Sequence, residues 1–150
     1  MPEKTRVLFL CTHNSARSQM AEGFLRELGG DRFEAASAGT EARGLNPLAV
    51  QAMAEAGIDI SLQESKTLDR YVNEPFDLVI TVCDDANEAC PYFPHTRERR
   101  HWSFPDPSAV RGDDETRFAA FRDVRDAIRD RLTRELLRTS GADATNRARR

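Results

Sequence analysis

One stretch decides the fold of this chain: Val7-Leu8-Phe9-Leu10-Cys11-Thr12-His13-Asn14-Ser15-Ala16-Arg17-Ser18. Its apolar start predicts a buried strand over Lys4–Leu10, because short runs of β-branched and aromatic residues favour strands. From Ser18 to Leu28 the apolar residues recur with a helical period, and two glycines follow. A short loop between a strand and a helix therefore carries Cys11 at one end and Arg17 at the other.

Such a loop is suited to binding a tetrahedral oxyanion next to a thiolate. A helix N-terminus carries partial positive charge and N–H groups, so it attracts anions and stabilises a nearby cysteine as the thiolate. Arg17 can hold two oxyanion oxygens, Asn14 tolerates a left-handed backbone, and Ser15 and Ser18 can donate hydroxyls. The alternative is that Cys11 merely ends a buried strand and that the residues after it only open a helix.

Strands and helices alternate along the rest of the chain. A helix is expected between the capping residue Asn46 and Gly57. Further strands are expected over Arg32–Ser37, Phe76–Val82 and Arg99–Phe104, and further helices over Ser65–Tyr71 and Asp114–Arg138. Alternating elements predict a three-layer α/β fold, with a four-stranded parallel sheet and helices on both faces. We expect one domain over residues 1–139 and a disordered tail over residues 140–150, which has no apolar periodicity.

The composition excludes several classes of protein. The chain has 150 residues, 39% hydrophobic and 31% charged, and its net charge of −3 gives no reason to expect nucleic acid as a partner. The N-terminal apolar run is too short for a signal peptide, and no run is long enough to span a membrane. We therefore expect a cytoplasmic protein, in which three cysteines suit reactive thiols better than a disulfide framework.

The two later cysteines form the second candidate site. Cys83 follows the strand expected at Phe76–Val82, so it can meet Cys11 at the edge where parallel strands end. Cys90 lies seven positions further on, which is too wide for a C-x-x-C turn, and the partners of a zinc site are missing. A continuous helix would hold Cys83 and Cys90 too far apart for a disulfide, so their pairing requires a conformational change. The alternative is two unrelated free cysteines.

Asp106 lies between two prolines in Phe104-Pro105-Asp106-Pro107-Ser108. Stiff flanking residues hold its carboxyl group in place, which suits a general acid, although Asp and Pro also form ordinary turns. The three histidines, His13, His95 and His101, do not show metal-ligand spacing. We expect no bound metal or cofactor.

Taken together, these motifs resemble the thioredoxin-coupled arsenate reductases, which share the fold and anion loop of the low-molecular-weight protein tyrosine phosphatases. The resemblance runs from about Lys4 to about Arg138. It rests on the segments Cys11–Gly23, Ser37–Gly39, Asn46-Pro47, Thr81–Ala86, Cys90-Pro91 and His101–Pro107. The anion loop alone does not separate a reductase from a phosphatase, but the additional cysteines do.

The resemblance implies a relay of thiols that reduces arsenate and serves arsenic resistance. Cys11 would attack arsenic, and Asp106 would protonate the leaving hydroxyl. Cys83 would then attack Cys11 and release arsenite, and Cys90 would form a redox-active disulfide with Cys83 that thioredoxin reduces. The implied substrate-binding residues are Thr12, His13, Asn14, Ser15, Ala16, Arg17 and Ser18. The implied partners are arsenate and thioredoxin, and we expect a monomer that binds neither nucleic acid nor membrane.

Several residues depart from the family pattern. His13 stands where many relatives have glycine, and Ala16 stands where many have another cysteine. Some relatives bind potassium beside the equivalents of Asn14 and Ser37 through an aspartate, whose matching position here is Lys66. The resemblance therefore implies that an ammonium group takes the place of the cation.

Two other functions stay open at this point. A phosphatase would use only Cys11, Arg17 and Asp106, although such enzymes usually carry a tyrosine where this chain has Ser108. A non-catalytic oxyanion-binding or redox-sensing protein would need neither Asp106 nor the relay. The reductase is favoured over the phosphatase by Ser108, Cys83 and Cys90.

Overall fold

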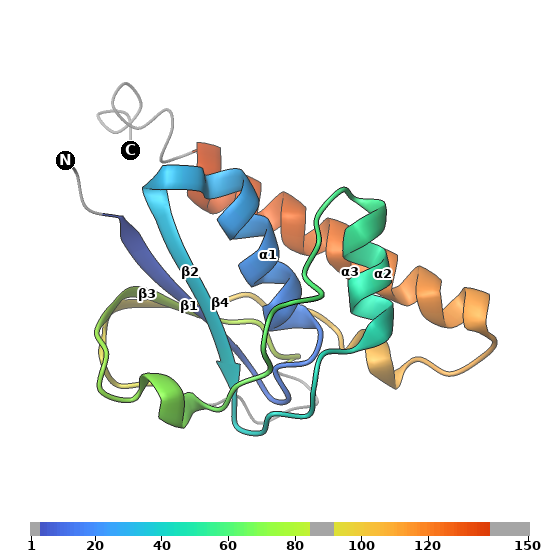
Figure 1. Cartoon of the computed structure of the whole chain (residues 1–150), viewed down its shortest axis with the longest axis horizontal. Helices are drawn as coiled ribbons and strands as arrows, with labels where there is room; N and C mark the ends of the chain where they lie inside the picture. The colour runs from blue at the N-terminus through green and yellow to red at the C-terminus, as the bar shows by residue number, and fades with distance from the viewer. Residues whose placement is uncertain (1–3, 85–91, 139–150) are drawn as a thin grey trace.

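The structure is a computed structural model that describes residues 4–84 and 92–138 (Figure 1). Four parallel strands form one sheet in the order β2-β1-β3-β4. The strands are β1 (Thr5–Cys11), β2 (Phe33–Gly39), β3 (Phe76–Thr81) and β4 (Thr96–His101). The helices are α1 (Arg17–Gly29), α2 (Pro47–Glu55) and α3 (Asp114–Leu132), with short 3-10 helices η1 (Gly30–Arg32), η2 (Leu68–Tyr71) and η3 (Pro107–Ala109) and a π-helical turn at Thr133–Leu137.

The central strand β1 divides the core into two halves. Val7 and Phe9 face the half that contains the three α-helices, and both side chains are fully buried. Leu8 and Leu10 face the other half, because successive side chains of a strand point to opposite faces. An apolar run that is buried on both faces is typical of a parallel sheet, which explains why this strand shows no polar alternation.

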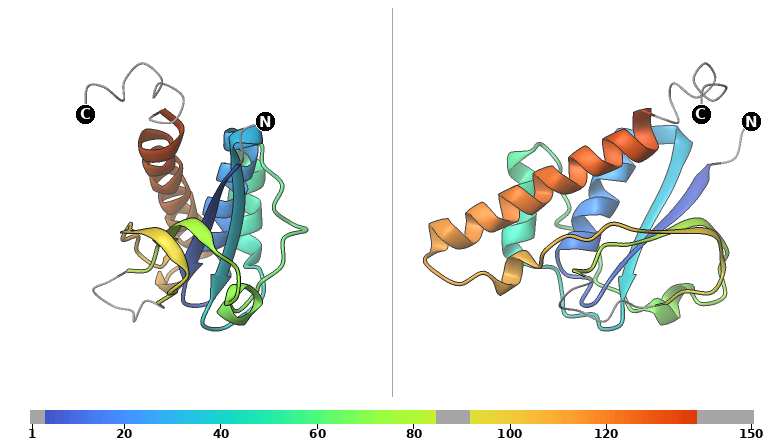
Figure 2. Two further views of the ribbon diagram at one scale, coloured as in Figure 1. Left: turned by 90° about the vertical axis from the view of Figure 1, so that its left-hand side faces the viewer. Right: turned by 180° about the vertical axis from the view of Figure 1, so that it is seen from behind.

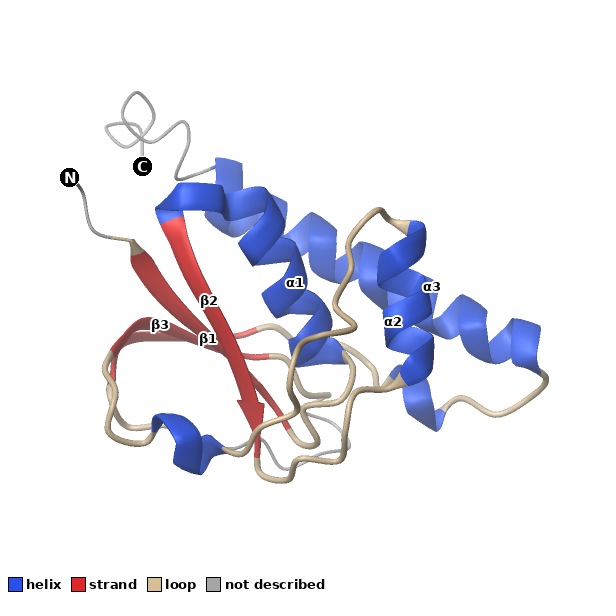
Figure 3. Ribbon diagram, in the orientation of Figure 1, coloured by secondary structure: helices blue, strands red, loops and turns tan. Residues whose placement is uncertain are grey.

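The layers on the two faces differ in thickness. Helices α1, α2 and α3 lie together on one side of the strands, and their buried apolar side chains share one core with β1 (Figures 2 and 3). The other face is covered by the short helix η2, whose Leu68 and Tyr71 pack on the second core, and by the loops beside it. The predicted three-layer α/β fold with a four-stranded parallel sheet is confirmed, and η2 is the helix of the second face.

Local sequence signals explain where the helices begin and end. Asn46 caps α2, because its side chain accepts a hydrogen bond from the Leu48 amide at 2.8 Å, and a proline occupies the first helical position. Asp113 caps α3 in the same way. Helix α1 begins after Ala16 and has no side-chain cap. The capping residue of α1, at the end where the anion loop lies, therefore contributes no side-chain hydrogen bond to the first turn.

Some boundaries differ from the sequence prediction. Strand β4 is Thr96–His101 rather than Arg99–Phe104, because it is an edge strand whose side chains are largely exposed and charged and so lack the apolar pattern of a strand. The helix predicted at Ser65–Tyr71 is only the 3-10 helix η2. Leu28, placed in the apolar stripe of α1, is 44% exposed. The tail predicted at residues 140–150 lies outside the described residues.

None of the helices within residues 4–84 and 92–138 is both long enough and apolar enough to cross a membrane.

Candidate active site

The loop that follows β1 is the centre of the candidate site. Strand β1 ends at Cys11 and helix α1 begins at Arg17, so five residues connect them. Cys11 pairs in register with Gly39 at the end of β2, and the Val82 amide donates to the Leu10 carbonyl oxygen at 2.8 Å. The loop therefore lies at the carboxyl edge of the parallel sheet, where this fold class places its ligands.

The carbonyl oxygens of the loop are bonded to the rest of the protein. Those of Thr12, His13 and Ser15 accept hydrogen bonds from backbone amides of the segment 41–46 at 3.0, 3.2 and 2.9 Å. The carbonyl oxygen of Asn14 accepts hydrogen bonds from two side chains outside the loop. Because the carbonyls are held outward, the loop can present its N–H groups to an anion at its centre, which is the nest-like arrangement of phosphate sites.

Asn14 braces the loop from inside the protein. Its backbone has φ 48°, the only positive φ of a non-glycine residue among the described residues. Its side-chain Nδ2 donates to Ser18 Oγ at 2.8 Å and to Ser37 Oγ at 2.9 Å. Its Oδ1 accepts from the Lys66 amide at 2.7 Å and from Gln19 Nε2 at 2.9 Å. The four bonds use the full capacity of both polar ends of this buried amide.

Cys11 has the surroundings of a nucleophile. The residue is 2% exposed, and its Sγ lies 2.9 Å from Ser18 Oγ in the first turn of α1. Ser18 Oγ already accepts a hydrogen bond from Asn14 Nδ2, so its own hydroxyl proton is available for a hydrogen bond to the sulfur. A hydroxyl that donates to sulfur stabilises a thiolate, as does the positive end of the helix dipole.

Arg17 and Asp106 lie together at the mouth of the loop. Arg17 is 3% exposed; its Nη1 donates to the Phe104 carbonyl oxygen at 3.1 Å, and its Nη2 lies 3.8 Å from Asp106 Oδ2. The other carboxyl oxygen of Asp106 accepts from the Ser108 amide and hydroxyl at 2.9 and 2.7 Å. Asp106 therefore caps the turn η3 and also faces the guanidinium of Arg17. This position is compatible with a general acid and with a turn-forming residue.

Cys83 follows β3, two residues after the end of the strand, and is fully buried. Cys11 and Cys83 are both thiols rather than half-cystines. The sheet brings the ends of β1 and β3 side by side, as the sequence predicts for these two residues. Cys90 lies outside the described residues.

Behind the loop lies a buried pair of opposite charges. Lys66 Nζ lies 3.8 Å from Glu22 Oε1 and donates to the Glu64 carbonyl oxygen at 2.6 Å. Burial lowers the pKa of Lys66 below its usual value, and the nearby Glu22 charge acts against this. The ammonium group supplies positive charge at this place and repels a second cation, so the residues present do not fit a potassium ion here.

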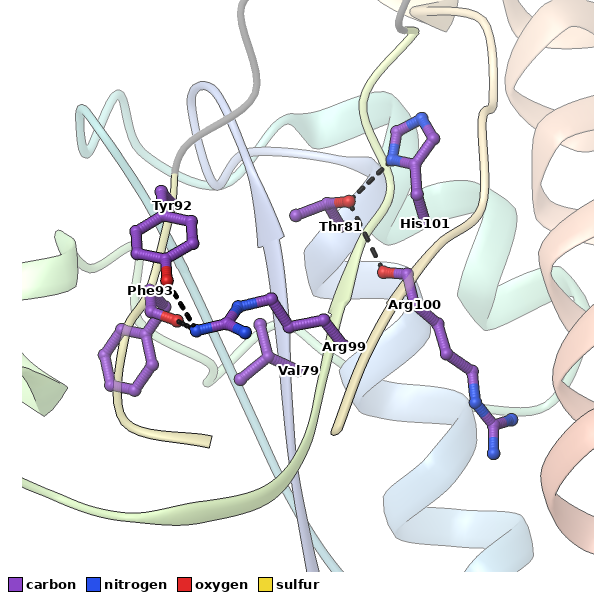
Figure 4. Close-up of a pocket in the computed structure, with 7 residues that line it drawn as sticks. All are labelled: Val79, Thr81, Tyr92, Phe93, Arg99, Arg100 and His101. Atoms are coloured by element: carbon purple, nitrogen blue, oxygen red, sulfur yellow. Dashed lines mark hydrogen bonds between the residues drawn. The ribbon is translucent and has the colours of Figure 1, made fainter. Parts of the chain in front are cut away.

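A separate hollow lies beside the ends of β3 and β4 (Figure 4). It has a volume of about 320 Å³, and Arg99 lies over the ring of Tyr92 at one side of it. At the other side Thr81 Oγ1 and His101 Nδ1 are 2.6 Å apart. None of its lining residues belongs to the anion loop, so this hollow is not the oxyanion site.

The structure thus brings together the anion loop from Thr12 to Ser18, Cys11, Arg17 and Asp106, and it places Cys83 at the same sheet edge. Sequence reasoning did not single out Gln19 or Glu22, which support the loop from within α1. Glu22 lies four positions after Ser18, so the helical period is the signal that could have found it. No cluster of three or more potential metal ligands occurs among residues 4–84 and 92–138.

Comparisons with known proteins agree with this geometry. Residues 6–145 match the family "Low molecular weight phosphotyrosine protein phosphatase". An arsenate reductase of Halalkalibacterium halodurans is 50% identical over 129 residues, covering 86% of this chain and 93% of that protein. An arsenate reductase of Bacillus subtilis is 49% identical over 130 residues, covering 87% and 94%.

Solved structures show the same relationship. The structure of an arsenate reductase in its oxidized state superposes with a TM-score of 0.73 at 32% identity, covering 87% of this chain and 95% of that one. The chain belongs to the low-molecular-weight phosphotyrosine protein phosphatase family and, within it, to the group of the arsenate reductases.

Proposed function

We propose that this protein reduces arsenate to arsenite by a relay of three thiols. The observation that carries this proposal is the position of the Cys11 sulfur, 2.9 Å from Ser18 Oγ and at the base of a loop whose carbonyls are held outward. Relatives that are about half identical over most of their length are arsenate reductases. Arsenate is a tetrahedral oxyanion, which is the shape that such a loop holds.

The first step forms a bond between sulfur and arsenic. The Cys11 thiolate attacks arsenic, while Arg17 and the loop amides bind the oxygens on which negative charge collects. Asp106 donates a proton to the departing hydroxyl, which leaves as water. The product is a covalent Cys11–arsenic(V) adduct.

The second step reduces arsenic. The Cys83 thiolate attacks Cys11 Sγ, a disulfide forms between the two residues, and the electron pair of the sulfur–arsenic bond passes to arsenic. Arsenic(V) becomes arsenic(III) and leaves as arsenite. Cys90 then attacks Cys83 Sγ, which releases Cys11 as a thiolate and leaves a disulfide between Cys83 and Cys90.

We propose that thioredoxin restores this disulfide to two thiols. Two electrons must be supplied for each arsenate, and a protein dithiol donates them by thiol–disulfide exchange. The relay requires three reduced cysteines at the start of each cycle, which suits the cytoplasm, the compartment we propose. A monomer suffices for this relay, because all three cysteines belong to one chain.

The test is an assay that couples arsenate reduction to thioredoxin, thioredoxin reductase and NADPH. We expect arsenate to drive NADPH consumption by the parent protein. Cys83→Ser and Cys90→Ser each interrupt the relay, so we expect both variants to lose multiple turnover of arsenate. Multiple turnover at the parent rate by either variant would contradict the relay.

Phosphate-ester hydrolysis is a second candidate, because Cys11, Arg17 and Asp106 are sufficient for it. Against it stands Ser108, where such phosphatases usually carry a tyrosine that contacts an aromatic substrate. Hydrolysis of a chromogenic aryl phosphate separates the two functions, since it needs neither Cys83 nor Cys90. We expect weak hydrolysis that persists in both serine variants, whereas a hydrolysis rate far above the arsenate rate would favour the phosphatase.

A further inference from the structure

The hollow of about 320 Å³ at the ends of β3 and β4 is lined by apolar and basic residues (Figure 4). Val79 and Phe93 contribute buried side chains, each 2% exposed, while Arg99 and His101 contribute basic groups. No aspartate or glutamate lines it. An apolar hollow at the surface with a polar rim is typical of a place that contacts another molecule. The thiol relay uses none of these residues, so the hollow needs an explanation of its own.

Tyr92 is a preorganised contact residue at one side of the hollow. It is 69% exposed, and it is the only exposed phenylalanine, tyrosine or tryptophan within residues 4–84 and 92–138. The guanidinium of Arg99 lies 4.6 Å from the centre of the Tyr92 ring, and its Nη2 donates to the Tyr92 hydroxyl at 2.8 Å and to the Phe93 carbonyl oxygen at 3.1 Å. A ring that is fixed before binding loses little conformational entropy when a partner covers it. Tyrosine and arginine are also residues in which the binding energy of interfaces concentrates.

The hollow is close along the chain to both cysteines of the final disulfide. Thr81 lines it two residues before Cys83, and Tyr92 lines it two residues after Cys90. Two residues of chain span at most about 7 Å. A protein that binds a second protein covers about 800 Å² of its surface, which is a much wider patch. A protein-sized reductant of Cys83 and Cys90 therefore contacts the hollow, whereas a small dithiol has no need of it.

The strand beside the hollow adds positive charge. The side chains of Arg97, Arg99 and His101 share one face of β4, because alternate residues of a strand point to the same face. Glu98 lies on the other face of the strand, where it pairs with Arg100 at 2.7 Å. Arg97 is 85% exposed. This face therefore favours a partner whose contact surface has an apolar centre with carboxylates around it.

We propose that this hollow and the adjoining face of β4 are the docking surface for thioredoxin, the protein dithiol that reduces the disulfide between Cys83 and Cys90. The proposal rests on the proposed function and gives its electron donor a place on the molecule. One thiolate of the donor attacks the disulfide and forms a mixed disulfide, and the second thiol of the donor then displaces the remaining sulfur. Two thiols are restored and the donor leaves as a disulfide, so two electrons are transferred.

The test follows reduction of this disulfide alone, without arsenate. In a Cys11→Ser background only Cys83 and Cys90 remain, so oxidation with diamide forms a single intramolecular disulfide, which mass spectrometry verifies. Its rate of reduction is measured with thioredoxin, thioredoxin reductase and NADPH, and separately with dithiothreitol. A protein that forms no such disulfide would contradict the relay, and this proposal with it, before any surface variant is compared. Failure of the relay is thus recognised separately from failure of the docking surface.

Substitutions on the surface should slow thioredoxin but not dithiothreitol. We expect Tyr92→Asp to lower the second-order rate constant with thioredoxin by roughly tenfold, as the loss of an interface anchor does, and Tyr92→Phe to keep most of the rate. Arg97→Glu should lower this constant by roughly threefold at low ionic strength and by less at high ionic strength, because a charge at the rim acts mainly on the association rate. Arg97 pairs with Asp77 at 3.7 Å on the surface, so its replacement should disturb the fold little.

Arg32→Glu is the matched control for charge reversal. Arg32 directly precedes β2, which is the opposite edge strand, and lies at the other end of the sheet from the hollow. We expect this variant to react with thioredoxin at the parent rate. Thermal unfolding checks every variant, and Arg97→Glu tests the surface by itself if Tyr92→Asp does not fold. The proposal is overturned if the Tyr92→Asp and Arg97→Glu variants keep the parent rate with thioredoxin, if Arg32→Glu loses as much, or if dithiothreitol is slowed as much as thioredoxin.

Discussion

The two roles proposed for Asp106, general acid and turn former, can be separated by substitution. Its Oδ1 accepts two hydrogen bonds from Ser108 and holds the turn, while its Oδ2 faces Arg17. Asparagine can cap a turn as aspartate does, but it cannot donate an acidic proton. We therefore expect Asp106→Asn to leave the melting temperature nearly unchanged and to slow arsenate reduction by about 100-fold or more, the usual size of general acid catalysis.

Steady-state assays and thermal unfolding of the same preparation check this prediction, and aryl phosphate hydrolysis should slow in parallel. Ser108→Ala is the matched control, because it removes only the hydroxyl bond at 2.7 Å and leaves the Ser108 amide in place. An unchanged arsenate rate in Asp106→Asn would assign this residue to the turn alone.

At Gly39 the addition of a single carbon atom would disturb the candidate site. A Cβ at this residue would lie 2.8 Å from the carbonyl oxygens of Cys11 and Thr12 and 2.9 Å from the Asn14 amide nitrogen. All three are backbone atoms, so the anion loop itself would have to move. We expect Gly39→Ala to cost about 1–3 kcal/mol of unfolding free energy and to weaken phosphate binding. Chemical denaturation and isothermal titration with phosphate measure the two effects. An unchanged affinity for phosphate would show that the loop accommodates the added Cβ.

At the scale of elements, α2 and α3 are joined by charge as well as by apolar contact. Glu55 at the end of α2 accepts hydrogen bonds from Arg122 and Arg125 of α3, each at 2.6 Å. These hydrogen bonds lower the pKa of Glu55 from its usual 4.5 to about 2. Because the folded-state pKa is below the unfolded value, the contact stabilises the folded protein above pH 4.5 and this contribution is lost as the pH falls toward about 2.

We therefore expect Glu55→Gln to lower the melting temperature at neutral pH, by a small amount because Glu55 is exposed to solvent. The difference from the parent protein should shrink as the pH is lowered from 4.5 to about 2. Melting curves across this pH range provide the measurement. A difference of constant size at every pH would show that the contact does not depend on the charge of Glu55.

The helices and strands differ in how well their type and bounds can be predicted from sequence. Helix α3 was predicted well, because its apolar side chains recur with the helical period and are buried against the core. Strand β1 was predicted because it is buried on both faces. Strand β4 was misplaced because an edge strand held by one neighbour can consist of charged residues such as Arg97 and Arg99, and only its pairing with β3 defines it.

At the scale of the whole molecule, the anion loop connects parts of the chain that are distant in sequence. Its carbonyls bind the segment 41–46, Asn14 binds Lys66, and Arg17 binds the Phe104 carbonyl. An oxyanion in the loop favours the folded state in which all of these contacts exist, and it has no binding site in the unfolded chain. We expect phosphate at about 100 times its dissociation constant to stabilise the protein by about 2.7 kcal/mol.

Differential scanning fluorimetry with increasing phosphate measures this effect, and the melting temperature should rise steadily with concentration. Arg17→Ala removes one of the groups that we propose bind the anion, so the rise should be much smaller in that variant. Chloride at the same ionic strength is the control for general salt effects. An equal rise with chloride would contradict binding in the loop.

The sequence by itself determined the class of fold and the position of the anion loop, and it predicts which groups react there. This was possible because the strand, the loop and the start of the helix follow one another from Val7 to Ser18. The spacing of the cysteine, arginine and serine within this stretch therefore indicates the kind of site they form. Only the tertiary structure decided that Gln19 and Glu22 support the loop from behind and how the supporting residues are bonded. Ser37 and the Lys66 amide bond to Asn14, and Glu22 accepts from Ser37. These contacts exist because β2 lies beside β1 and because the segment after α2 returns to the sheet edge. Such contacts depend on the packing of distant elements, and no local pattern of residues encodes them.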